Sequence, residues 1–121
     1  MGFKATHRFA RISARKVRPL ADLVRGRYAD EALEVLKYQP HRGARMLEKV
    51  LRSAIGNAQD PDQNNGRSYA PERLFVVDAR VDGGPMFKRI RPRARGMAYG
   101  ILRRTSHISV ELASIDELVA D

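Results

Sequence analysis

Cysteine is absent from the 121-residue chain. Its absence excludes a disulfide scaffold and any zinc site built on cysteine thiolates, and it is compatible with a reducing cytosol. Long apolar runs are also missing. No segment approaches the roughly 20 apolar residues that a membrane-spanning helix needs. The first 16 residues lack the apolar run of a secretory signal peptide. The composition therefore favours neither a secreted nor a membrane protein.

Catalytic motifs with a recognisable spacing are lacking as well. The sequence contains no H-E-x-x-H zinc motif, no P-loop, no nucleophile elbow and no dinucleotide-binding fingerprint. The histidines His7, His41 and His107 are far apart in the sequence, and no carboxylate is spaced to pair with them. We therefore expect no enzyme activity, no metal site and no cofactor. A nuclease that uses His7, His41 or His107 is the enzymatic alternative.

Acidic residues are also lacking from Met86–Arg104, although this segment carries seven basic residues. A proline and two glycines interrupt the segment, so a continuous helix is unfavourable there. The flanking segments 74–81 and 105–112 read as strands, and the sequence therefore predicts a long β-hairpin. Its basic middle has too few apolar residues to bury a core and too many like charges to fold onto itself.

Positive charge is concentrated in two parts of the chain. The net charge is +9 and the isoelectric point is about 10.6, as is typical of proteins that bind nucleic acids. Residues 1–27 contain eight basic residues and one acidic residue, and residues 73–104 contain nine and two. Segments 28–72 and 105–121 are slightly acidic overall. If the two ends of the chain pair in one sheet, the two basic segments can converge on one face.

A hairpin with this much positive charge is expected to need an anionic partner. Folded RNA is a polyanion that can surround an arm on several sides, and arginine suits bidentate phosphate contacts and base stacking. The alternative is a solvated edge hairpin whose charges only prevent aggregation, a task that one or two lysines usually perform. The candidate RNA-binding residues are Arg8, Arg11, Arg15, Lys16, Arg18, Arg25, Lys88, Arg89, Arg91, Arg93, Arg95, Arg103, Arg104 and His107.

The rest of the chain predicts a strand and then three helices. Residues 3–12 alternate with a period of two, which is typical of a half-buried strand. The first helix follows Ser13, a good N-cap residue, and ends at Gly26; Pro19 predicts either a kink or a later start. A second, short helix spans about residues 29–38. The expected buried positions of the strand are Phe3, Ala5, His7 and Phe9.

The third helix is the clearest element, because apolar residues keep helical spacing over four turns. Pro40 is expected to be its first residue. In the hairpin strands, alternate apolar residues predict one buried face, and Gly83-Gly84-Pro85 predicts a bulge where the strand leaves the body. The expected buried stripe of the helix is Ala44, Leu47, Val50, Leu51, Ala54, Ile55 and Ala58. The expected buried positions of the hairpin strands are Phe75, Val77, Ala79, Val81, Ile108, Val110 and Leu112.

Three segments strongly resemble one known family. ISARKVRPLADLVRGR (12–27), LEKVLRSAIGNA (47–58) and GPMFKRIRPRARGMAYGILRRTSHISV (84–110) are similar, in unbroken order, to the universal L-twenty-two family of large-subunit ribosomal proteins. The stretches KRI-RPRARG and RRTSHI are highly specific to it. Met97 and Tyr99 stand where the family more often has polar or basic residues.

The resemblance implies an α+β fold in which three helices pack on a small three-stranded antiparallel sheet with a long protruding β-hairpin. We expect a single ribosomal-protein domain over residues 1–121, with a globular body of about 1–83 and 105–121 and an arm of about 84–104.

The resemblance also implies a structural constituent of the large ribosomal subunit in the cytoplasm. Such a protein binds the 23S-type RNA, contacts neighbouring large-subunit proteins, supports assembly and does not form homo-oligomers. Its hairpin tip lines the exit tunnel beside the nascent peptide, near where macrolides bind. The expected tip residues are Arg91, Pro92, Arg93, Ala94, Arg95 and Gly96. The alternative is a free-standing basic RNA-binding module or RNA chaperone.

Overall fold

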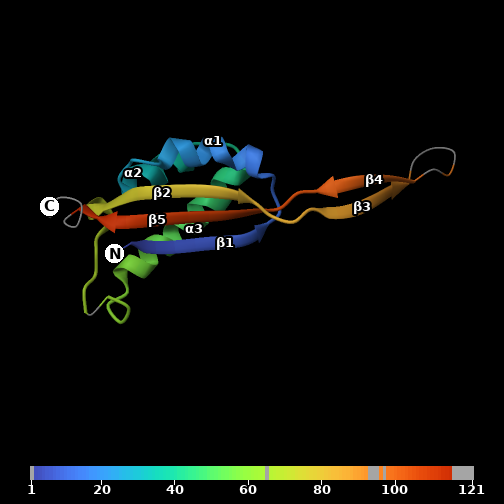
Figure 1. The fold of residues 1–121 in the computed structure, drawn as a ribbon. Coiled ribbons are helices and arrows are strands. Elements are labelled where there is room, and N and C mark those ends of the chain that lie inside the picture. The colour runs from blue at the N-terminus through green and yellow to red at the C-terminus, as the bar shows by residue number, and fades with distance from the viewer. Residues whose placement is uncertain (1, 65, 93–95, 97, 116–121) are drawn as a thin grey trace.

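The computed structural model describes residues 2–64, 66–92, 96 and 98–115, which form a body and a projecting arm (Figure 1). The predicted α+β architecture is confirmed. The elements in chain order are β1 (Phe3–Ala10), α1 (Ala14–Val24), α2 (Ala29–Lys37), α3 (Arg42–Gln59), the short 3-10 helix η1 (Pro71–Arg73), β2 (Leu74–Gly83), β3 (Phe87–Pro92), β4 (Ala98–Arg103) and β5 (Ser106–Ser114).

The body is built on a three-stranded antiparallel sheet in the order β1-β5-β2. The first and last strands of the chain are therefore neighbours, with Phe3 opposite Leu112 and His7 opposite Ile108. The helices pack on one face of the sheet, with α3 against β1 and β5 and α1 against β2. β1 and β2 both end opposite Ser106, the first residue of β5. The two basic segments, 1–27 and 73–104, therefore meet at the end of the body where the arm begins.

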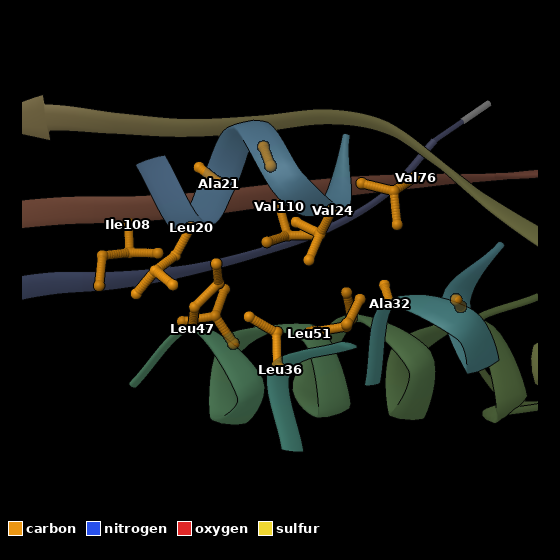
Figure 2. Packing of buried hydrophobic residues seen from close by; sticks show 14 of the residues in the cluster. Leu20, Ala21, Val24, Ala32, Leu36, Leu47, Leu51, Val76, Ile108 and Val110 are labelled. Carbon is orange, nitrogen blue, oxygen red and sulfur yellow. The ribbon is translucent and has the colours of Figure 1, made fainter. Parts of the chain in front are cut away.

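The core lies between the helices and the sheet (Figure 2). Helical spacing identified its helical members correctly: the whole predicted stripe of α3 is buried, from Ala44 to Ala58. Leu36 of α2 and Leu47 and Leu51 of α3 point into the same space. Among the described residues, no helix has both the length and the apolar character needed to span a bilayer.

Two predicted helix starts need correction. The later start of the first helix is wrong: α1 begins at Ala14 and continues through Pro19. Ser13 precedes it with extended backbone angles, although its side chain makes no capping hydrogen bond. Pro40 does not open the third helix, because α3 begins at Arg42 with His41 as its N-cap residue. Gly26 does follow the end of α1 in the left-handed conformation, with φ +85°.

Two bulges overturn part of the predicted strand parity. The register of β2 against β5 shifts between Val76 and Asp78, so Val76 is buried and Val77 is 44% exposed. The predicted burial of Val77 is therefore wrong, whereas that of Ala79 and of the β5 residues is confirmed. The register of β1 shifts between His7 and Ala10. Phe9, expected to be buried, is 50% exposed instead.

Candidate nucleic-acid interface

The arm is a separate two-stranded ribbon that leads away from the body (Figure 1). Strands β3 and β4 pair antiparallel, from Phe87 opposite Arg103 to Pro92 opposite Ala98. The predicted hairpin is thus divided into a body pair, β2 with β5, and an arm pair, β3 with β4. Lys88, Arg103 and Arg104 are exposed. The ribbon therefore presents positive charge without a helix packed on it.

The Lys88 side chain crosses the neighbouring strand at Gly100. A Cβ atom on that glycine would lie 2.9 Å from Cε of Lys88. The absence of a side chain thus leaves room for the aliphatic part of the lysine to lie on the ribbon, with its ammonium group at the surface. Arg89 and Arg91 occupy positions in β3, opposite Ile101 and Tyr99.

The expected tip is described only in part. Arg91 and Pro92 end β3, and Gly96 has a φ of +68°, a conformation that glycine adopts without strain. Arg93, Ala94 and Arg95 lie outside the described residues. The predicted tunnel-facing role of all six tip residues stays a prediction.

A clamp at the base of the arm joins it to the body. The backbone N–H of Gly84 donates to the Thr105 carbonyl at 2.9 Å, and the Thr105 hydroxyl donates to the Pro85 carbonyl at 2.6 Å. A Cβ atom on Gly84 would lie 2.5 Å from Oγ1 of Thr105, so any larger residue would force the Thr105 side chain to shift. Between the last body pair, Gly83 with Ser106, and the first arm pair, Phe87 with Arg103, lie three residues on one side (84–86) and two on the other (104–105). The predicted bulge at Gly83-Gly84-Pro85 lies at this joint.

His107 belongs to the same joint. Its Nδ1 accepts a hydrogen bond of 3.0 Å from the backbone N–H of Phe9, and the two rings meet edge-on with centroids 4.9 Å apart. Sequence reasoning treated His107 as an RNA contact and did not foresee this bond. The bond depends on the bulge in β1, which no residue pattern in the strand indicated. RNA contact by His107 stays a prediction.

Four basic side chains from β1, the bend after it and α1 form a second positive region, here called the N-terminal basic cluster. All four are exposed, and in the described part of the chain none of them has a carboxylate partner. The Arg8 guanidinium lies over the Phe9 ring, 5.4 Å from its centroid. Exposed guanidinium and ammonium groups without a carboxylate partner are available for phosphate oxygens. The cluster consists of Arg8, Arg11, Arg15 and Lys16.

Arg18 and Arg25 have a structural task that the sequence did not reveal. Nε of Arg18 donates to the Val81 carbonyl at 3.1 Å, and a guanidinium nitrogen of Arg25 donates to the Ala79 carbonyl at 2.5 Å. Arg25 also pairs with Asp22 at 2.8 Å. Both arginines thus satisfy carbonyl groups along the outer edge of β2, which would otherwise be an unpaired sheet edge. Their predicted contact with RNA is untested.

The arrangement offers no catalytic centre within the described residues. No group of three or more histidine, aspartate or glutamate residues there could hold a metal ion. His7 in β1 pairs with Ile108, the residue after His107 in β5, whereas His41 is the N-cap residue of α3, and the three histidines do not form one cluster. A concavity of about 400 Å³ on the body is lined by Arg27, Asp30, Glu31, Glu34 and Val35. It lies apart from the arm.

Comparison with known proteins identifies the family. The family model described as ribosomal protein L22p/L17e matches residues 5–113, which include nearly all of the body sheet, α1 to α3 and the arm. The chain belongs to this family. It is similar to the large ribosomal subunit protein uL22 of Rhodopirellula baltica, with 68% identity over 96% of this chain and 98% of the relative.

More distant bacterial relatives support the same family. The chain is 50% identical to the uL22 protein of Caldicellulosiruptor saccharolyticus, over 89% of this chain and 84% of the relative. It is 45% identical to that of Roseiflexus sp., over 98% of this chain and the whole relative. The resemblance drawn from the sequence is confirmed. Because the family consists of structural ribosomal proteins, the prediction that the chain is not an enzyme is also confirmed.

Proposed function

We propose that the protein is built into the large subunit of the cytoplasmic ribosome and binds 23S-type RNA through the arm and the N-terminal basic cluster. The observation that carries this proposal is the basic two-stranded ribbon that leaves the body at Gly84 and Thr105. Its base is clamped, so the arm leaves the body in a defined direction. Such a projection serves a partner that surrounds it, and folded RNA is that partner.

A ribbon only two strands wide suits insertion between RNA segments. Six residues of β3 extend about 20 Å at ~3.3 Å per residue, before the tip is counted. Arginine guanidinium groups on the arm can bind phosphate groups bidentately, and each neutralised phosphate releases counterions. The RNA is expected to be read by shape across several segments and not as one sequence. The arm would therefore help to hold those segments together during subunit assembly.

The finer part of the proposal concerns the tip. We infer from the family resemblance that residues 91–96 line the exit tunnel beside the nascent peptide. The left-handed turn residue Gly96 supports a tight reversal there. The body, which carries its own core, would remain at the subunit surface and contact neighbouring large-subunit proteins. A single copy per subunit is expected.

Sedimentation through a sucrose gradient at high salt tests the proposal. Tagged protein expressed in cells should migrate with the large subunit, and a variant with Lys88, Arg103 and Arg104 changed to alanine should be partly released. Wild-type protein found only at the top of the gradient would overturn the ribosomal assignment and favour a free-standing RNA-binding module or RNA chaperone. That rival would also bind unrelated RNAs as tightly as large-subunit RNA.

A further inference from the structure

Phe9 has a backbone conformation that is unusual for its residue type. Its φ is +57°, and it is the single non-glycine with positive φ among residues 2–64, 66–92, 96 and 98–115. The left-handed region brings Cβ of an L-residue close to its own carbonyl oxygen and costs free energy. Strained positions of this kind concentrate at binding and catalytic sites. The conformation persists because the Phe9 N–H is held by Nδ1 of His107 at 3.0 Å.

The strain places an aromatic ring at the surface. The bulge turns Phe9 out of the alternation of β1, and the residue is 50% exposed while its neighbour Ala10 is 1% exposed. The ring rests edge-on against His107, and the Arg8 guanidinium lies 5.4 Å from its centroid. The Phe9 ring is therefore in edge-on contact with the His107 imidazole, and the Arg8 guanidinium lies over it.

A purely structural role does not account for the choice of phenylalanine. Glycine would adopt the same φ without strain and would keep the N–H bond to His107. The ring adds little to the core, whereas the other paired aromatic residues of the body are better covered. Phe3 packs on Tyr69 with centroids 5.2 Å apart, and both are half-buried. The exposed surface of Phe9 is thus available to a ligand.

The charges around Phe9 indicate what that ligand is. Arg8 and Arg11 are exposed on the same turn of chain, and Arg104 is two positions before Ser106, the β5 partner of Ala10. Three exposed cationic side chains close to Phe9 in the fold favour a polyanion. Aromatic rings and guanidinium planes are the surfaces on which unpaired bases of RNA stack.

We propose that an unpaired nucleobase of the large-subunit RNA stacks on the Arg8–Phe9 pair at the base of the arm, with an adjacent phosphate bound by Arg11. This site rests on the proposed function and adds to it a place where RNA contact does not depend on charge alone. The stack would fix the register of the RNA at the point where the arm enters it.

Binding of purified variants to protein-free large-subunit RNA tests the site. Phe9→Leu keeps an apolar side chain but removes the ring, and it should weaken binding at least about fivefold, the low end of the loss expected for one stacked base. The loss should be the same at every salt concentration, because no phosphate contact is removed. Phe9→Tyr keeps the ring and should bind like the wild type.

Two further variants control for folding and for aromatic surface in general. Phe9→Gly removes the ring and relieves the backbone, so it should fold at least as stably as Phe9→Leu and bind as weakly. Tyr38→Ala removes a tyrosine that is 76% exposed at the C-cap of α2, outside the Arg8–Phe9 pair, and should leave binding unchanged. If Phe9→Leu and Phe9→Gly bind like the wild type, the stacking site is overturned.

Ultraviolet crosslinking of the wild-type complex, followed by peptide mass spectrometry, gives a second readout. A nucleotide attached to Phe9 is the expected result. Crosslinks confined to the arm would overturn the site while leaving the proposed function standing. If the wild-type protein does not prefer large-subunit RNA over an unrelated RNA, the proposed function itself fails.

Discussion

The β2–β5 pair and the β3–β4 pair follow one another along the same two stretches of chain, but only the first pair is covered by helices (Figure 1). In the body pair, Val76, Ala79, Ile108 and Val110 are buried against α1 and α3. In the arm pair, Phe87, Lys88 and Arg103 are exposed. The body can therefore fold by burying apolar surface, whereas an isolated two-stranded ribbon is marginally stable at best.

The contrast predicts that folding and RNA binding depend on different parts of the chain. Substitutions in the core of the body should change the free energy of unfolding and leave the exposed RNA-binding groups in place. Substitutions in the arm should change RNA binding with little effect on unfolding. The joint at Gly84 and Thr105 is the place where one change should affect both properties.

Removal of the arm should have the largest effect. Replacement of Met86–Arg104 by a short Asn-Gly turn removes seven basic residues, while the Gly84–Thr105 hydrogen bond can still close the end of the sheet. We expect loss of co-sedimentation with the large subunit, and a salt-dependence slope for RNA binding that falls by about 5 to 6, at roughly 0.7–0.9 per phosphate contact. The midpoint of urea unfolding should hardly move. Unfolding of the shortened chain would contradict the division into body and arm.

The next largest effect is expected in the core. Leu47 is fully buried, and Leu47→Ala should lower the free energy of unfolding by about 2–5 kcal/mol, through lost burial and the cavity that remains. Leu23→Ala is the matched control, because Leu23 is 40% exposed and should cost much less. Urea unfolding followed by circular dichroism measures both. Similar losses for the two leucines would contradict the assigned core.

A smaller effect is expected at the joint. Gly84→Ala would place a Cβ atom 2.5 Å from Oγ1 of Thr105, and relief of that clash should cost about 1–3 kcal/mol. Thr105→Val removes the hydroxyl that donates to Pro85. Because both changes act on the same contact, the double variant should lose less stability than the sum of the single variants. If the losses in free energy of unfolding, measured with urea, add strictly, the Gly84–Thr105 clamp is not the shared cause of the two losses.

The smallest effect is expected from a single arm charge. Arg104→Ala should change the free energy of unfolding by less than about 0.5 kcal/mol, because Arg104 is exposed. The slope of RNA affinity against salt should fall by about 0.7–0.9. Arg67→Ala serves as the control, because Arg67 lies in the loop between α3 and η1, at the opposite end of the body from the arm (Figure 1). Equal slopes for the two variants would contradict an interface at the arm.

Local sequence determined the helices and the division between body and arm. The i, i+3, i+4 spacing of apolar residues from Ala44 to Ala58 specifies one face of α3 whatever that face packs against. Seven basic residues and no acidic one within Met86–Arg104 specify a segment that cannot enter a core. Both features act over a few residues, so they can be read before any partner strand is known.

Only the tertiary structure decided which strand residues face the core and what several basic residues do. The bulges in β1 and β2 depend on the register against β5, and they reversed the expected burial of Phe9 and Val77. Arg18 and Arg25 reach the edge of β2 only because α1 packs beside it. Register and packing come from contacts between distant parts of the chain. The alternation of a single strand cannot reveal an inserted residue that exchanges its buried and exposed faces.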